Sequence, residues 1–118
     1  MRALLLATLL ATSTGANAYV PPPIGHLILS TIEMIRIDKD GFATVYFANT
    51  LWAEYGSCRG AGLESALAFD SKTLAGKSLL DVMLNAKAKN YNLSGEGTGL
   101  CMMINGNSVE TVNYLLVT

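Results

Sequence analysis

One segment of the sequence, residues 74–89, has the pattern of an amphipathic helix, and the strand-like runs around it limit the fold. Polar side chains recur at every fourth position along one face: Lys77, Asp81, Asn85 and Lys89. The apolar stripe is centred on Leu80, Met83 and Leu84. Ser71 and Thr73 are candidate N-caps, and Asn90 suits the C-terminal end. The pattern therefore predicts a single helix that packs one face against a sheet.

Three strand-like runs precede this helix. Residues 26–37 are rich in Ile and Leu and lack glycine, and residues 42–49 combine aromatic and β-branched residues. The Asp-Gly turn at 40–41 predicts that these two runs form a β-hairpin, the first being one long strand. Residues 63–69 alternate Leu63, Ser65, Leu67 and Phe69 with Glu64, Ala66 and Ala68, which predicts a third strand with one side lined by larger apolar residues.

Two more strands are predicted after the helix, residues 91–101 and 108–117, joined by an Asn-Gly turn within 102–107. The resulting order is β-β-β-α-β-β. This is the order of the OB-fold, so the expected fold is mainly β with one helix, arranged as a five-stranded small barrel. An open sheet with the helix on one face is the alternative.

The N-terminus resembles a secretory signal peptide. Arg2 is followed by an apolar core over residues 3–11, and Ala16-Asn17-Ala18 is a small-x-small cleavage site. We expect cleavage after Ala18, so that residues 1–18 are removed and 19–118 form a single exported domain. No other apolar run is long enough to span a membrane. The predicted location is therefore periplasmic or secreted.

Charge and cysteine content narrow the possible partners. The formal net charge of the chain is −1, which gives no basic face for nucleic acid or an anionic membrane. Cys58 and Cys101 are predicted to form a disulfide, as expected in an oxidising compartment. With His26 as the one histidine, the usual four-ligand zinc set is not available, and we expect neither a metal nor a cofactor.

Two glycine-containing segments imitate nucleotide-binding loops. Residues 71–78 match the end of a P-loop but carry Ser71 where the first glycine is needed. Residues 95–101 lack the spacing of a dinucleotide-binding loop and precede no helix. Gly95, Gly97 and Gly99 instead share one face of a strand, which permits close approach of another group. We favour packing by a neighbouring strand or the helix over ligand contact.

No arrangement of residues indicates catalysis. The chain has no G-x-S-x-G nucleophile elbow, and His26 is interpreted as an ordinary residue at the start of a strand. The carboxylates are scattered, and most are expected on outer strand faces: Glu33, Glu54, Glu64, Glu96 and Glu110. Asn92 begins a glycosylation sequon, which has meaning only in a eukaryotic secretory pathway. We therefore expect a non-enzymatic protein.

The loop over residues 50–62 is the predicted ligand-binding segment. Trp52 and Tyr55 offer flat apolar faces, and Glu54 and Arg59 offer charged hydrogen-bonding groups. This combination suits a glycan and also suits a protein partner. The alternative is that Trp52 closes the bottom of the barrel.

The layout resembles the B subunits of the subtilase-cytotoxin and pertussis-like bacterial toxins. The similarity runs from Gly25 to Cys101 and includes the long first hairpin, the cysteine loop and the helix before a strand ending in cysteine. It implies an OB-fold protomer, a ring-shaped homo-oligomer, often a pentamer, and glycan recognition on the outer faces. The sugar-contacting serine of that family has no clear counterpart, because Ser30 is only the nearest serine.

The helix, the G-T-G-x-C run and the segment from Glu110 to Leu115 are also similar to small uncharacterised exported bacterial proteins, a resemblance that implies no activity. Two hypotheses result. The first is a secreted, toxin-B-subunit-like ring that binds a glycan, a protein or an exported enzyme subunit. The alternative is a monomeric periplasmic accessory or inhibitor module of unknown ligand.

Overall fold

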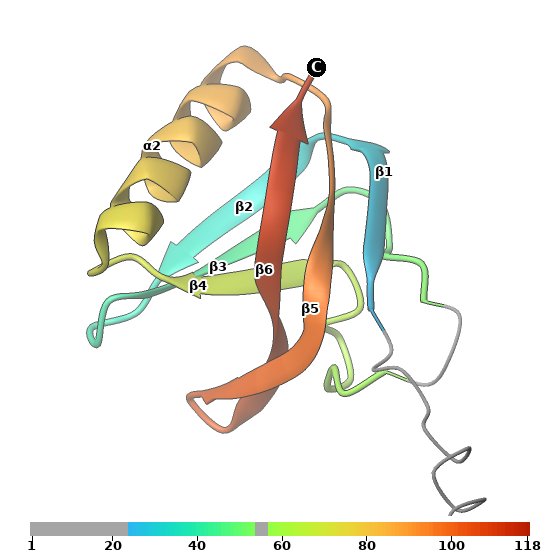
Figure 1. Ribbon diagram of the computed structural model, residues 1–118, viewed down its shortest axis with the longest axis vertical. Helices are drawn as coiled ribbons and strands as arrows, with labels where there is room; N and C mark the ends of the chain where they lie inside the picture. Colours follow the sequence, from blue (N-terminus) through green and yellow to red (C-terminus); the bar gives the residue numbers. More distant parts are fainter. Residues whose placement is uncertain (1–23, 54–56) are drawn as a thin grey trace, which may run out of the picture.

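The computed structural model describes residues 24–53 and 57–118, which form a β-rich domain with one helix (Figure 1). The signal peptide expected over residues 1–18 lies outside the described residues. The elements in chain order are β1 (His26–Ser30), β2 (Ile32–Ile37), β3 (Phe42–Phe47), β4 (Ala66–Asp70), α2 (Leu74–Lys89), β5 (Leu93–Ile104) and β6 (Asn107–Val117). No helix among the described residues is long and apolar enough to cross a membrane.

The strands form one six-stranded mixed sheet in the order β1-β5-β6-β4-β3-β2. All neighbours are antiparallel except β4 and β6, which run parallel and pair at Ala68 and Thr111. The predicted class, mainly β with one helix, is confirmed. The prediction of five strands is corrected to six, and the sheet is not closed into a barrel.

The sixth strand arises because residues 26–37 do not form the single strand that was predicted. Leu29 has a φ of 41°, and the register with β5 shifts between Leu27 and Ser30, which ends β1. Thr31 alone separates β1 from β2, yet the two strands lie at opposite ends of the sheet order. The Asn49 side chain donates to the carbonyl of Leu29 at 3.2 Å and stabilises the break.

The helix α2 has the predicted bounds, and its ends are capped as expected. Thr73 Oγ1 accepts a hydrogen bond from Gly76 N, and Asn90 has a left-handed backbone. Met83 is buried and Leu80 packs against the core, as predicted, whereas Leu84 is exposed and Ala86 is buried in its place. The buried helix residues are Gly76, Met83 and Ala86, and Gly76 packs against the carbonyl of Asp70.

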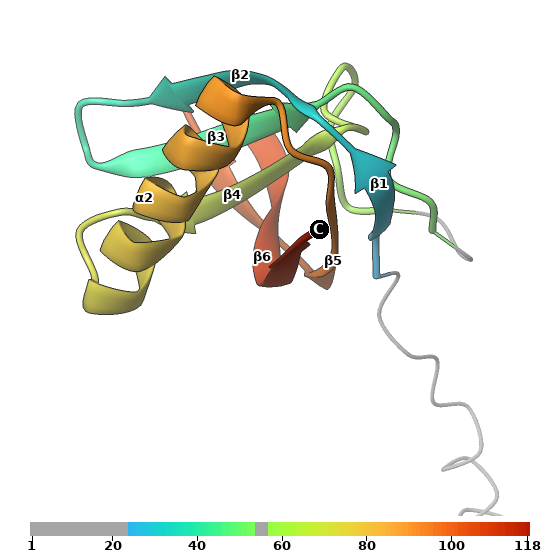
Figure 2. The ribbon, with the colours of Figure 1, turned by 90° about the horizontal axis from the view of Figure 1, so that it is seen from above.

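Strand β4 is buried on both faces, and its larger apolar side chains, Leu67 and Phe69, lie on one side as predicted. Leu67 and Phe69 belong to a core shared with α2 and β3, while Ala66 and Ala68 contact a second core with Ile104 and Val109. Figures 1 and 2 show why both faces are covered: α2 lies on one side of β4, and the far half of the β5–β6 hairpin crosses the other.

The β5–β6 hairpin bends strongly along its length. Its register shifts twice, between Glu96 and Gly97 and between Gly97 and Cys101, and Gly99 has a φ of 82°. Bulges of this kind bend a strand and increase its twist. The start of β5 pairs with β1 and with the end of β6, and a row of exposed and partly exposed side chains crosses these three strands.

Candidate functional site

The candidate site is a row of four side chains on the outer face of the sheet: Trp52, His26, Glu96 and Tyr114. His26 is paired with Trp52 on one side, through an isolated β-bridge, and with Glu96 of β5 on the other. Glu96 is in turn paired with Tyr114 of β6. Residues directly opposite in adjacent strands share a face. We call these four residues the aromatic row.

The next row of paired residues along the same strands shows which face of the sheet carries the aromatic row. Leu27, Gly95 and Leu115 are paired in the same way, and Leu27 is buried while Leu115 packs against the main core. Side chains alternate between faces along a strand. The aromatic row therefore points away from the core, and three strand spacings separate its ends by about 14 Å.

Polar groups lie at the centre of the aromatic row and aromatic rings at its ends. The side chains of His26 and Glu96 are 40% and 24% exposed, and His26 Nδ1 lies 3.4 Å from Glu96 Oε2. Trp52 is 58% exposed and Tyr114 45%. The His26 and Trp52 ring centroids are 5.6 Å apart, and Asn113 Nδ2 donates to Glu96 Oε1 at 3.3 Å. A ligand would thus meet a carboxylate and an imidazole between two rings.

The backbone holds Trp52 beside β1 although Trp52 belongs to no named strand. His26 N donates to the Trp52 carbonyl at 2.6 Å, and Trp52 N donates to the His26 carbonyl at 2.9 Å. Of the four predicted ligand-binding residues, Trp52 is therefore in the row. Glu54 and Tyr55 lie outside the described residues.

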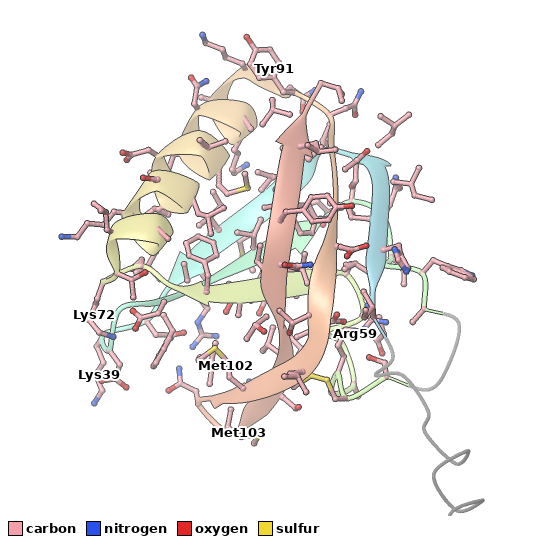
Figure 3. The ribbon with its side chains drawn as sticks, in the orientation of Figure 1. Lys39, Arg59, Lys72, Tyr91, Met102 and Met103 are labelled. Atoms are coloured by element: carbon pink, nitrogen blue, oxygen red, sulfur yellow. A yellow bond between two sulfur atoms is a disulfide. The ribbon has the colours of Figure 1, made fainter. Side chains whose placement is uncertain are left out.

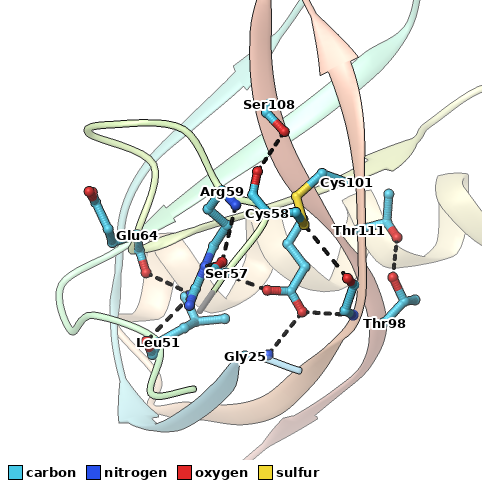
Figure 4. A network of polar contacts seen from close by, with 12 residues as sticks. Gly25, Leu51, Ser57, Cys58, Arg59, Glu64, Thr98, Cys101, Ser108 and Thr111 are labelled. Carbon is cyan, nitrogen blue, oxygen red and sulfur yellow. Dashed lines mark hydrogen bonds and ion pairs between the residues drawn. A yellow bond between two sulfur atoms is a disulfide. The ribbon is translucent and has the colours of Figure 1, made fainter. Parts of the chain in front are cut away.

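The fourth predicted residue, Arg59, is placed away from the surface. Its side chain is 4% exposed, and its Nε lies 3.6 Å from Oε1 of Glu110, whose side chain is fully buried. The guanidinium also donates to the carbonyls of Leu51 and Glu64 and to Ser57 Oγ. Arg59 is thus part of an internal network and is not available on an exposed binding face (Figure 4).

Glu110 was expected on an outer strand face, and the structure corrects this. Its Oε2 accepts hydrogen bonds from Gly25 N and Gly99 N, both at 2.9 Å. Both donors are backbone amides of neighbouring segments, and the carboxylate fills the space that side chains at Gly25 and Gly97 would occupy. The sequence could not predict that Glu110 is buried, because a glutamate is rarely buried unless charged or hydrogen-bonding partners surround it, and these partners come from distant segments.

The glycine face of β5 is a packing surface, as the sequence suggested. A Cβ on Gly95 would overlap the Tyr114 carbonyl of β6, and one on Gly97 would overlap the Glu110 carboxylate. The expected occupant, a neighbouring strand, is present at Gly95. At Gly97 the space is occupied by a charged side chain, which the sequence did not indicate.

The predicted disulfide joins Cys58 to Cys101, with their Cα atoms 5.9 Å apart. The disulfide links the loop after Trp52 to β5. Cys58 immediately precedes Arg59, and Cys101 is paired with Glu110 in the β5–β6 ladder. Ser108 Oγ donates to the Cys58 carbonyl at 2.7 Å beside it. The bond is consistent with an oxidising, extracytoplasmic location.

A small cavity lies across the sheet from α2, lined by Arg36, Asp38, Thr44, Tyr46, Ile104, Asn107 and Val109. Its volume is about 10 Å³, which is room for a single water molecule. Asp38 Oδ1 accepts from Arg36 and Asn105, while Oδ2 is buried with no partner among the described residues. Within those residues, no group of three metal-ligating side chains is present.

Sequence reasoning missed His26, Glu96 and Tyr114 because each looks ordinary in its own segment. They become neighbours only through the register of β1, β5 and β6, and the shift between Glu96 and Gly97 could not be read from the sequence. The one available signal was alternation, which placed Glu96 on the face opposite the glycines. Comparison with family models, with curated proteins and with solved structures finds no match to this chain.

Proposed function

We propose that this protein is an exported, non-enzymatic binding protein that recognises a glycan through the aromatic row. The observation that carries the proposal is the placement of two exposed rings, Trp52 and Tyr114, on either side of the His26–Glu96 pair. The disulfide supports export, because such bonds persist in oxidising compartments.

The chemistry of the row fits a sugar. Aromatic faces cover the apolar C–H faces of pyranose rings, while a carboxylate and an imidazole exchange hydrogen bonds with hydroxyl groups. Both polar groups are already oriented, since His26 contacts Glu96 and Asn113 donates to the same carboxylate. Because the backbone positions of the two aromatic residues are three strand spacings, about 14 Å, apart, the row suits an oligosaccharide more than a single sugar ring.

We further propose that the domain is a variant of the OB-fold that assembles into a ring. Together β1 and β2 act as one bent first strand, which pairs with β5 at one end and with β3 at the other. The helix then follows the third strand, as in the OB order. Exposed apolar side chains lie on both of these end strands, Ile28 and Leu29 on β1 and Met34 and Ile37 on β2, which supports contact between copies.

The second candidate is a monomeric accessory or inhibitor module that binds a protein, including an exported enzyme subunit. Ile28 and Leu29 favour it, because they add exposed apolar surface on β1, the strand that also carries His26. A protein partner would cover these residues together with Trp52, whereas a glycan would need the polar centre of the aromatic row.

Glycan-array binding of the oxidised, exported protein tests the proposal. Trp52→Ala and Tyr114→Ala should each weaken binding about tenfold or more, the loss of a stacked ring corresponding to roughly 1.4 kcal/mol or more. Glu96→Gln should weaken it as well, since hydrogen bonds to a charged acceptor are the stronger ones.

Tyr91→Ala is the matched control, because Tyr91 is an exposed tyrosine at the end of α2 and lies outside the row (Figure 3). This variant should bind as the parent does. Binding that is insensitive to Trp52, Glu96 and Tyr114 would contradict the glycan proposal. Loss of a protein partner on Ile28→Ser and Leu29→Ser, without any glycan binding by the parent, would favour the second candidate.

A further inference from the structure

We infer that the buried Arg59–Glu110 pair is a positioning device that holds both Trp52 and His26 in the aromatic row. The inference concerns the residues behind the binding surface. It rests on the proposed function only for the consequence that binding should depend on this pair, and the placement of the two rings can be tested without any ligand.

The Glu110 carboxylate acts on the β1 side of the row. Its Oε2 accepts from Gly25 N at 2.9 Å, and Gly25 immediately precedes His26. The Gly25 carbonyl in turn accepts from Gly97 N at 2.9 Å, one residue after Glu96. One carboxylate oxygen therefore fixes where β1 begins relative to β5, at the pairing of His26 with Glu96.

Arg59 acts on the Trp52 side of the row. Its Nη1 donates to the carbonyls of Leu51 and Glu64, at 3.4 and 3.1 Å. Leu51 immediately precedes Trp52, and Leu51 N also donates to the Glu64 carbonyl at 3.0 Å. The guanidinium thus links the segment that precedes Trp52, at the Leu51 carbonyl, to the segment that precedes β4, at the Glu64 carbonyl (Figure 4).

Burial makes the two halves depend on each other. The side chains of Arg59 and Glu110 are 4% and 0% exposed, so each charge needs the other. Among the described residues, Glu110 Oε1 has no hydrogen-bond donor, and its charged neighbour is Arg59. Removal of the guanidinium therefore takes away a hydrogen-bond donor of the Leu51 carbonyl and leaves the carboxylate without its counter-charge.

Nuclear magnetic resonance of the oxidised protein tests this directly, because the chain has one histidine and one tryptophan. The nuclear Overhauser contact between the His26 and Trp52 rings, whose centroids are 5.6 Å apart, reports the geometry of the row without ligand. Arg59→Lys keeps the positive charge but loses the several hydrogen-bond donors of the guanidinium. In this variant the ring contact should be lost and the His26 ring resonances should shift.

A double variant, Arg59→Met with Glu110→Gln, provides the same test without a buried unpaired charge, and replacement of a buried ion pair in this way is often tolerated. It should keep a dispersed amide spectrum and the disulfide while losing the ring contact. Arg36→Met is the matched control, because Arg36 is an exposed arginine paired with Asp38 away from the row, and it should retain the contact.

Persistence of the His26–Trp52 contact in both folded Arg59 variants would overturn the inference, whatever happens to binding. If the contact is lost and glycan affinity falls at least tenfold, both the inference and the proposed function are supported. If the contact is lost while glycan binding is unchanged, the positioning role stands and the proposed function fails.

Discussion

At the residue scale, Glu110 shows how a small domain can use a fully buried charge. The carboxylate is surrounded by glycines and backbone amides, and its two oxygens serve different neighbours. Such a pair adds little net stability against an apolar alternative, yet loss of one partner is costly. The arrangement therefore favours one placement of β1 and of the segment that carries Trp52 over other placements.

Gly97→Val tests this packing. The new side chain would occupy the position of the Glu110 carboxylate, so either β5 moves or the ion pair breaks. We expect the free energy of unfolding to fall by about 3 kcal/mol or more, the scale of a broken buried pair. Urea denaturation of the oxidised protein measures the change.

Gly60→Ala is the control for that experiment, because a Cβ at Gly60 meets its neighbours at ordinary distances of 3.5 Å and beyond. This substitution should leave the stability close to that of the parent. An unfolding midpoint for Gly97→Val equal to that of Gly60→Ala would show that the glycine face of β5 is open.

At the scale of the element, the junction of β4 and α2 carries a titratable contact. The hydrogen bond from Lys72 N holds the pKa of Asp70 below its usual value of 3.8; partial burial opposes this shift and the Lys72 side chain adds to it. Lys72 Nζ lies 3.2 Å from the same carboxylate oxygen that accepts from Lys72 N. The folded state therefore favours the ionised form of Asp70.

The sign of the pH dependence follows. Because the folded pKa lies below the unfolded one, the contribution of Asp70 is present above the ordinary pKa of 3.8 and is lost as the pH falls through the folded value. Asp70→Asn should lower the free energy of unfolding at neutral pH. The difference in stability between this variant and the parent should become smaller in acid. Urea midpoints at neutral pH and near pH 2 check this, and a pH-independent difference would contradict it.

At the scale of the whole molecule, the disulfide connects the loop behind Trp52 to the bent hairpin. Its half-cystines are 43 residues apart in sequence, and the chain-entropy model gives a contribution of about 4 kcal/mol for such a loop. We expect Cys58→Ser with Cys101→Ser to lose stability of this order in urea denaturation. The reduced parent should match the double variant, and a reduced parent as stable as the oxidised one would contradict the prediction.

Assembly is the other prediction at this scale. The exposed side chains on β1 and β2, together with a net charge of −1, favour self-association through the strand edges. Sedimentation at micromolar concentration should give a closed homo-oligomer, and Met34→Lys with Ile37→Lys should shift it toward monomer. Leu74→Lys, at an exposed helix position, is the control. Monomer mass alone for the parent would contradict the ring.

Much of the local structure could be predicted because it depends on neighbours along the chain. The bounds of α2, its Thr73 cap and its Asn90 end follow from side chains within one turn of each terminus. The Asn-Gly turn after β5 and the glycine face of that strand were readable for the same reason. Residue types alone also indicated the disulfide, since the chain has two cysteines.

Features that depend on register and on contacts between distant segments were decided only by the tertiary structure. The kink at Leu29, the two shifts in β5 and the second core on β4 each depend on partners far along the chain. They place Glu110 inside and bring His26, Glu96 and Tyr114 into one row. The alternation within a strand specifies which side chains share a face. Which of the two faces is buried, and which residues lie opposite in the adjacent strands, depends on the register of strand pairing, which the local sequence does not encode.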